Sequence, residues 1–143
     1  MDIIIDANLL VALVTQHPQR QTVYQQFERW ASQDAALHAP DLAYSEVTSA
    51  LTRMVAAGLF EREKSQAVCE ELTALPIQYH TVGFNPEVVV RALELGRKSA
   101  YDAVYLVLAQ RLDADLWTLD SPLYRNAVGR GHPVYLLENS EGL

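Results

Sequence analysis

The sequence predicts a three-layer α/β/α domain with a mostly parallel sheet of four or five strands. Short apolar segments of strand length alternate along the chain with longer segments of helical spacing, which is the pattern of βαβ units. The first strand segment, Ile3 to Ile5, is β-branched and apolar at every position, as expected of a strand covered on both faces. The segment Ala103 to Ala109 is apolar on every side of a helix, and we expect it to be buried in the middle of the fold.

Composition is typical of one globular domain, which we take as residues 1–143. Half of the residues are hydrophobic and 20% are charged, a balance found in folded rather than disordered chains. Cys69 is the one cysteine, so an internal disulfide is excluded, and we expect it to be a small buried residue in a helix. No signal peptide precedes the first strand and no apolar run reaches membrane-spanning length, so we expect a cytoplasmic protein without membrane contact.

The net charge of −7 argues against passive, charge-driven binding to nucleic acid. It leaves open an enzyme that acts on nucleic acid, provided that metal ions neutralise the site, and it leaves open a basic partner protein. Charge therefore restricts how the chain would bind nucleic acid without excluding nucleic acid as a substrate.

Two helices are expected after the first strand. Leu9 to Val14 is a short apolar segment that the pair His17-Pro18 ends. Gln19 to Ser32 has its large apolar residues at helical spacing, which places them on one face. These residues are Val23, Phe27 and Trp30.

One strand and two further helices follow. Strand 36–39 ends at Pro40-Asp41, and Asp41 is the expected N-cap of a helix over 42–57 that Gly58 stops. A second helix over 61–75 ends before a proline.

The second half of the chain alternates strands and helices. Strand 77–82 shows alternating apolar and polar residues, and Asn85-Pro86-Glu87 then supplies a cap, a proline at the first helical position and an acid in the first turn. That helix ends at Gly96. The remaining expected elements are helix 99–112, strand 116–119, helix 122–128 and strand 134–137.

Four acidic residues fall where this topology would bring them to one edge of the sheet. Asp6 and Asp120 each follow an apolar strand directly, and ligands of α/β sheets bind outside the carboxyl ends of strands. Glu46 lies on the border of the apolar stripe of its helix, and Asp102 lies in the first turn of the buried helix. Each acid also has a simpler role alone: the aspartates as helix caps, with Ser99 completing a capping box for Asp102, and Glu46 as a solvated side chain.

Such a group of carboxylates suits a hard cation, because Mg²⁺ or Mn²⁺ takes oxygen ligands together with waters and phosphate oxygens. A bound cation lowers the pKa of an attacking water and stabilises charge on phosphorus, so no nucleophilic side chain is required. The sequence offers no Gly-x-Ser-x-Gly segment and no glycine-rich phosphate loop, and its four histidines lack the spacing of a zinc site.

Four segments resemble the PIN-domain family and, in size and layout, the VapC-type toxins of bacterial and archaeal toxin–antitoxin pairs. They are Ile4-Ile5-Asp6-Ala7-Asn8-Leu9-Leu10, Ala39-Pro40-Asp41-Leu42-Ala43-Tyr44-Ser45-Glu46-Val47, Ser99-Ala100-Tyr101-Asp102-Ala103 and Leu116-Trp117-Thr118-Leu119-Asp120. The resemblance implies an Mg²⁺- or Mn²⁺-dependent endoribonuclease whose acidic positions are Asp6, Glu46, Asp102 and Asp120. It further implies a homodimer and a cognate antitoxin protein that wraps the toxin and blocks its site.

Within this resemblance, Asp6 and Asp102 are the main metal ligands, and Glu46 binds through water or orients the attacking water as a general base. Asp120 would hold a second ion or its water, and Asn8 would hydrogen-bond a ligand carboxylate or a substrate phosphate. The RNA backbone would meet the nearest basic residues, which are Arg97, Lys98, Arg125 and Arg130.

Two other classes of protein remain open. Ala7 replaces the Ser or Thr common after the first aspartate, and Pro122 stands where many relatives carry another acid. These departures keep open a PIN-like module that binds partners without catalysis, and they leave one or two metal ions possible. An aspartate-based phosphatase, in which Asp6 takes the phosphoryl group, would require a second aspartate at the position that Asn8 occupies. The identity of the RNA is not encoded in these motifs.

Overall fold

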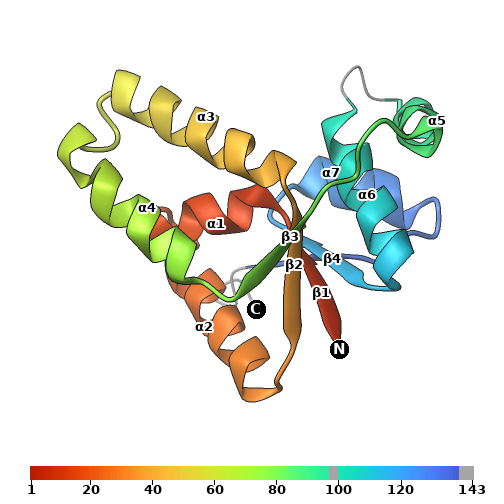
Figure 1. Ribbon diagram of the computed structural model, residues 1–143, viewed down its shortest axis with the longest axis horizontal. Helices are drawn as coiled ribbons and strands as arrows, with labels where there is room; N and C mark the ends of the chain where they lie inside the picture. The colour runs from red at the N-terminus through yellow and green to blue at the C-terminus, as the bar shows by residue number, and fades with distance from the viewer. Residues whose placement is uncertain (97–99, 139–143) are drawn as a thin grey trace.

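A computed structural model describes residues 1–96 and 100–138, and it has one sheet with helices on either side (Figure 1). All five strands are parallel, in the order β3-β2-β1-β4-β5. The strands are β1 (Asp2–Ile5), β2 (Ala36–Pro40), β3 (Ile77–His80), β4 (Asp115–Thr118) and β5 (Val134–Leu136). The predicted three-layer architecture is confirmed, and the sheet is parallel throughout.

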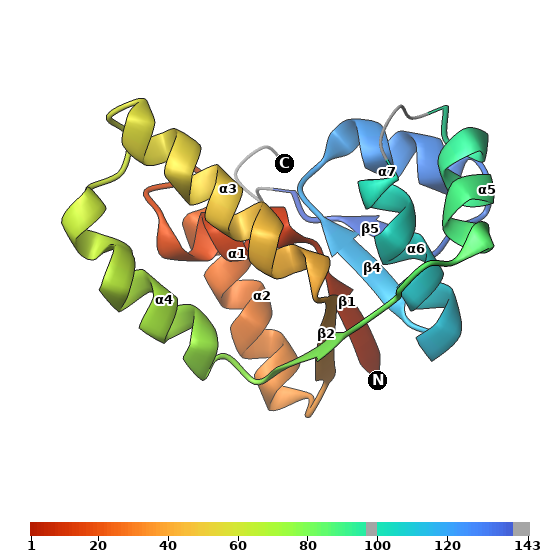
Figure 2. The same cartoon turned by 45° about the horizontal axis from the view of Figure 1, so that its top comes forward.

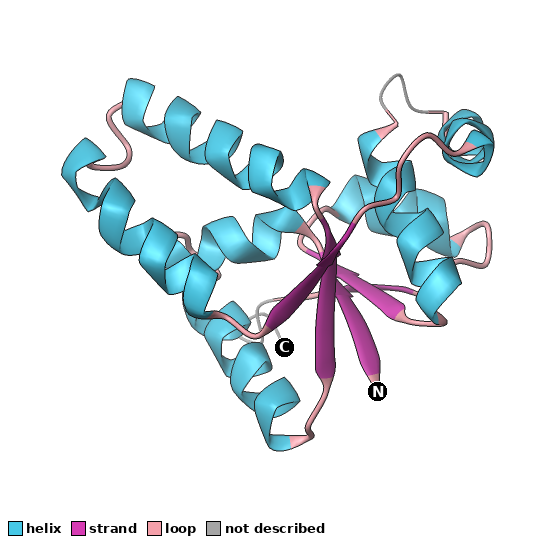
Figure 3. Ribbon diagram, viewed as in Figure 1, coloured by secondary structure: helices cyan, strands magenta, loops and turns pink. Residues whose placement is uncertain are grey.

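The helices form two layers that enclose the sheet, as the cyan elements on both sides of the magenta strands show in Figure 3. In the described part of the chain they are α1 (Ala7–Val14), α2 (Arg20–Ser32), α3 (Leu42–Ala56), α4 (Ser65–Ala74), α5 (Pro86–Glu94), α6 (Tyr101–Leu112) and α7 (Ser121–Val128). The first four helices lie on one side of the sheet, and α5, α6 and α7 lie on the other (Figures 1 and 2). No described helix has both the length and the apolar character needed to span a membrane.

The central strand β1 is buried on both faces, as its sequence predicts. Ile3 and Ile5 point into the layer of α1 and α2, where they join a cluster that includes Trp30. Ile4 points the other way and packs with α6 and with Leu116 of β4. The body of α6 is buried, also as predicted, because it lies directly against this second face.

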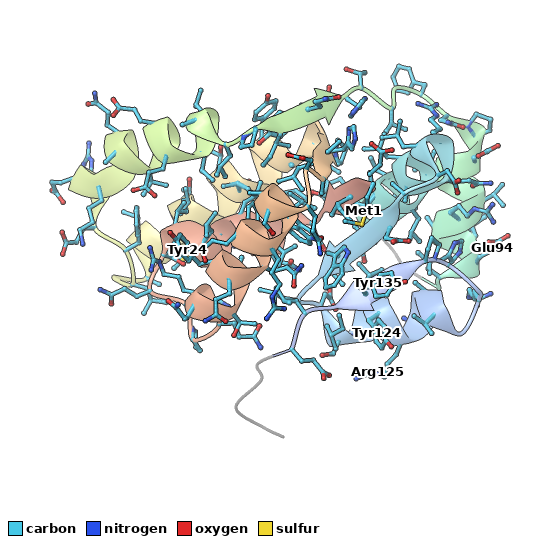
Figure 4. All side chains as sticks on the ribbon, turned by 90° about the horizontal axis from the view of Figure 1, so that it is seen from below. Met1, Tyr24, Glu94, Tyr124, Arg125 and Tyr135 are labelled. Atoms are coloured by element: carbon cyan, nitrogen blue, oxygen red, sulfur yellow. The ribbon has the colours of Figure 1, made fainter. Side chains whose placement is uncertain are left out.

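Aromatic rings connect the far end of the sheet to the first helical layer. The ring of Tyr135, labelled on β5 in Figure 4, stacks on Trp117 with a centroid distance of 5.1 Å. Trp117 in turn meets Trp30 of α2 edge-on at 5.4 Å. These contacts hold β4 and β5 against the layer that also carries α1.

Three local predictions are wrong. The expected helix 61–75 begins with a short 3₁₀ turn at Arg62–Lys64 before α4. Cys69 is exposed rather than buried, because α4 lies at the edge of the domain and buries little beyond Val68. The Asp41 side chain does not cap α3; its backbone is helical, with φ −62° and ψ −21°, and its carboxylate accepts a hydrogen bond from Thr81 Oγ1 at 2.8 Å.

Leu116→Ala should lower the free energy of unfolding by about 3 kcal/mol, because it leaves a cavity against β1 and α6 at a side chain with no exposed surface. Urea unfolding measures this change. Leu59→Ala is the matched control, since Leu59 is 71% exposed and its truncation should cost less than about 0.5 kcal/mol. Equal losses in the two variants would contradict the assignment of Leu116 to the core.

Candidate active site

The site lies where the chain reverses its direction of travel across the sheet. From β1 the chain adds β2 and β3 on one side, and it later adds β4 and β5 on the other. The carboxyl ends of β1 and β4 therefore open onto a switch point, the place where parallel α/β sheets bind ligands. In Figure 2 these strand ends lie between α3 on one side and α6 on the other.

Asp6 is the first residue after β1, and its side chain is turned toward β4 rather than toward its own helix. It occupies the N-cap position of α1 but makes no capping hydrogen bond there. Its Oδ2 accepts hydrogen bonds from Thr118 Oγ1 at 2.8 Å and from Asn8 Nδ2 at 3.3 Å. The Asp6 carboxylate therefore does not cap α1. Asp6 is also nearly buried, with 8% of the residue exposed.

Thr118 is the centre of this hydrogen-bond network, and it was not among the residues predicted from the sequence. Its hydroxyl donates to Asp6 and accepts from Asn8 Nδ2 at 3.1 Å and from the backbone N–H of Asp120 at 3.0 Å. Asn8 Oδ1 accepts from the Leu119 N–H at 3.2 Å, which adds a second link. The available signal for Thr118 was a polar residue that follows two apolar ones at the end of β4. The network fixes the end of β1 to the end of β4.

Asp120 caps a helix and also lies at the site. Its Oδ1 accepts a hydrogen bond from the Leu123 N–H at 3.0 Å and so caps α7, as the simpler interpretation of the sequence predicted. That cap uses one of the two carboxylate oxygens. Asp120 also lines the same pocket as Asp6.

Glu46 comes to the site from α3 and is held by a buried tyrosine. The Tyr105 hydroxyl of α6 donates a hydrogen bond of 2.7 Å to Glu46 Oε1. Tyr105 is 1% exposed, and burial together with the charges of Asp6 and Glu46 raises the pKa of its hydroxyl far above the ordinary value. The hydroxyl therefore remains a donor. Helical periodicity had assigned Tyr105 only to the apolar body of its helix, so this bond was missed.

One pocket of about 470 Å³ is lined by all four acids, which are Asp6, Glu46, Asp102 and Asp120. Asp102 reaches it from the first turn of α6, and Asn8 lines it from α1. Ser99, the expected partner of Asp102 in a capping box, lies outside the described residues. The acids that are dispersed in the sequence are thus brought together by the fold.

The carboxylates interact through their charges. Burial is the largest cause that raises the pKa of Asp6 to about 7, and the charges of Glu46 and Asp102 contribute to this rise against the lowering effect of the Thr118 hydrogen bond. Burial is also the main cause of a raised pKa at Glu46, with a further contribution from Asp102. Within residues 1–96 and 100–138, however, no three His, Cys, Asp or Glu side chains are close enough to enclose one ion. The four acids line one pocket, but no three of them surround a common point where an ion would sit.

The two basic residues predicted to meet RNA that the structure describes, Arg125 and Arg130, do not line this pocket. Arg125 lies on α7 beside Tyr124 (Figure 4), and Arg130 follows that helix. Arg97 and Lys98 lie outside the described residues. The cationic side chain that does line the pocket, among the described residues, is Arg53 near the end of α3, and the imidazole of His17 lines it as well.

Comparison with known proteins identifies the family and agrees with this fold. A sequence profile of the PIN domain matches residues 3–129. The chain is 32% identical over 128 residues to Ribonuclease VapC3 of Pyrobaculum aerophilum, covering 86% of this chain and 92% of that protein. This chain therefore belongs to the PIN-domain family. Its relationship to a VapC protein confirms the more particular resemblance carried by the four sequence motifs.

Solved structures show the same fold. The crystal structure of PAE2754 from Pyrobaculum aerophilum matches with a TM-score of 0.65 at 22% identity, over 88% of this chain and 79% of that one. The crystal structure of VapBC2 from Rickettsia felis bound to a DNA fragment from their promoter contains a chain that matches with a TM-score of 0.66 at 14% identity, over 96% and 100%.

Asp6→Asn should stabilise the metal-free protein above pH 7 and change its stability little at pH 4. The folded-state pKa of about 7 lies above the ordinary value of 3.8, so this carboxyl costs stability as the pH rises from about 4 to about 7. That difference corresponds to at most about 4 kcal/mol. Urea unfolding at a series of pH values, with a chelator present, measures the gain.

Asp113→Asn, at the exposed end of α6, is the control and should show no such pH-dependent gain. If Asp6→Asn were less stable than the wild type at pH 8, the cost of the buried Asp6 carboxylate inferred from its raised pKa would be disproved.

Proposed function

We propose that this protein is an Mg²⁺- or Mn²⁺-dependent endoribonuclease that hydrolyses RNA phosphodiester bonds. The observation that carries the proposal is the gathering of four carboxylates in one pocket at the switch point of a PIN-domain fold, where burial and neighbouring charge raise the pKa of Asp6. The 32% identical relative is named as a ribonuclease, which supports the same activity here. Acids that repel one another in a shared pocket favour a positive ligand between them.

The donor set fits a hard divalent cation. All four acids offer oxygen atoms, which is the ligand type of Mg²⁺ and Mn²⁺, and neither a thiolate nor a pair of histidines lines the described pocket. Mg²⁺ retains several waters and is commonly held by one or two carboxylates, so a site without three converging side chains suits it. Asp6 and Asp102 would bind the ion, with Asp120 beside them. When bound, the cation supplies positive charge that stabilises the transition state and promotes ionisation of the attacking water.

The chain's own residues would orient the reaction. Thr118 and Asn8 hold the Asp6 carboxylate in place from the end of β4 and the start of α1. Tyr105 fixes one oxygen of Glu46, so the other is free to accept a proton from water as it attacks phosphorus. The Leu123 N–H keeps the Asp120 carboxylate at the rim of the pocket.

We further propose that the protein is the toxin of a type II toxin–antitoxin pair and acts in the cytoplasm as a homodimer. The VapC relative and the VapBC2 likeness support a cognate antitoxin. Two apolar surfaces are available for protein partners. One is a groove of about 350 Å³ between α3 and α4, and the other is the outer face of α5, where Val89, Val90 and Leu93 are exposed.

Asp6→Asn and Asp102→Asn should each lower the rate of RNA cleavage about a hundredfold or more, because each removes a carboxylate from the proposed cation site. Cleavage of structured RNA with Mg²⁺ present measures this, and sequencing of the new RNA ends would name the target. Asp113→Asn, at the other end of α6, is the control and should cut at the wild-type rate. Wild-type cleavage by either site variant would refute the site assignment.

Calorimetry with Mn²⁺ separates a nuclease from a non-catalytic PIN-like module. The wild type should bind the ion, and Asp6→Asn should lose most of that binding. Absence of Mn²⁺ binding in the wild type would favour the module that acts only through partners.

Tyr105→Phe should lower kcat about tenfold and leave KM nearly unchanged, because Glu46 loses the hydrogen bond that orients it. Steady-state cleavage measures both constants. Tyr24→Phe, on the exposed side of α2 (Figure 4), is the control and should leave both unchanged. If Tyr105→Phe retained the wild-type kcat, Tyr105 would have only a packing role.

A further inference from the structure

The pocket that holds the acids has a second region of opposite chemistry. Along α3 and the connection between α1 and α2, its lining changes from carboxylates to hydrogen-bond donors. These are the side chains of Ser45, Ser49, Arg53 and His17. None of the functions assigned to the acids uses them.

The helical repeat of α3 places these donors in line with the acids. Glu46, Ser49 and Arg53 are separated by three and four residues, so they share one face of the helix. Arg53 is two turns beyond Glu46, about 10 Å along the helix axis at about 1.5 Å per residue. The face therefore runs from the proposed cation site to a positive charge at the far end of the pocket.

The Ser49 hydroxyl on this face differs from the threonine hydroxyls of the same helix in its hydrogen bonding. Thr48 and Thr52 donate to the carbonyl oxygens of Tyr44 and Thr48, at 2.7 and 2.8 Å. No such bond is found for Ser49 within the described parts of the chain. The threonine hydroxyls are satisfied by the helix, whereas that of Ser49 is available to a molecule in the pocket.

The two larger donors are also available. The Gln19 backbone N–H donates to His17 Nδ1 at 3.0 Å, which places the ring proton on Nε2. The Arg53 guanidinium has no ion pair or hydrogen bond within residues 1–96 and 100–138, unlike Arg91, which pairs with Glu94 at 3.1 Å. An arginine without a protein partner presents a planar set of donors that matches a phosphate.

An RNA strand in this pocket needs such a group. Each nucleotide adds a negative charge, the protein carries a net charge of −7, and four acids line the pocket. A cation at the acids neutralises only the phosphate beside it. The next phosphate along the strand would be repelled unless the protein supplied its own positive charge.

We propose that Arg53, assisted by His17 and Ser49, forms a subsite that binds the RNA backbone phosphate flanking the one that is cleaved. The proposal rests on the ribonuclease function proposed above and adds the track that the substrate follows, from the acids along α3. It assigns backbone binding to Arg53 in place of Arg125, which lies on α7 outside this pocket.

Binding of a short 2′-O-methyl RNA oligonucleotide, followed by fluorescence anisotropy at several salt concentrations, tests the subsite. Arg53→Gln should weaken binding roughly tenfold and reduce the slope of log Kd against log salt by about 0.7, the value for one lost phosphate contact on a single strand. Arg53→Lys should retain the slope, because the charge is kept. Arg111→Gln, in the exposed last turn of α6 and outside this pocket, is the matched control and should change neither quantity. His17→Ala should weaken binding by a smaller factor, since it removes one donor.

Two further readouts separate this subsite from the fold and from the proposed function. Arg53→Gln should raise KM for RNA cleavage while its Mn²⁺ affinity and urea unfolding stay those of the wild type. A wild-type salt slope in Arg53→Gln, with the wild type cutting RNA, would overturn the subsite alone. Failure of the wild type to cut RNA would refute the proposed function instead. Loss of Mn²⁺ affinity in Arg53→Gln would also overturn the subsite, because Arg53 would then act on the acids.

Discussion

Burial of β1 on both faces is the constraint on which the rest of the structure depends. Because Ile3 and Ile5 are held in one layer and Ile4 in the other, the strand can neither shift its register nor turn over. The residue that follows it, Asp6, is therefore delivered to one fixed point at the edge of the sheet. The Thr118 hydroxyl then joins that point to the end of β4. Two distant parts of the sequence become one site through a single buried hydrogen-bond network.

This site is maintained against electrostatic repulsion. Burial of Asp6, and after it the charges of Glu46 and Asp102, raise the pKa of this carboxyl, and the Thr118 hydrogen bond only partly offsets that rise. The surrounding core supplies the stability that holds such a group together. A local cost of this kind is expected where a protein binds a charged ligand, because an arrangement optimal for the ligand is rarely optimal for the empty fold.

The proposed function and the proposed subsite account for different halves of the same pocket. The acids create a region that a cation can occupy, and the donors of α3 create a region suited to phosphate. For a chain of net charge −7, this division allows a polyanion to approach at one place without a basic surface elsewhere. Tyr105 connects the two halves indirectly, since it anchors Glu46 at the boundary between them.

The sequence by itself determined the fold class and most element positions, because apolar periodicity and cap residues are local signals. The apolar run Ile3 to Ile5 and the Asn85-Pro86-Glu87 helix start are examples, and both formed as expected. The order of the sequence motifs also identified the four acids as candidate site residues.

The tertiary structure alone decided which neighbours these acids have. The hydrogen bonds of Asp6 to Thr118 and of Glu46 to Tyr105 join residues that are 112 and 59 positions apart in the sequence. It also decided that Cys69 is exposed and that Arg53 lines the pocket. The physical reason is that burial and charge interaction depend on which elements pack together, and no local pattern specifies that.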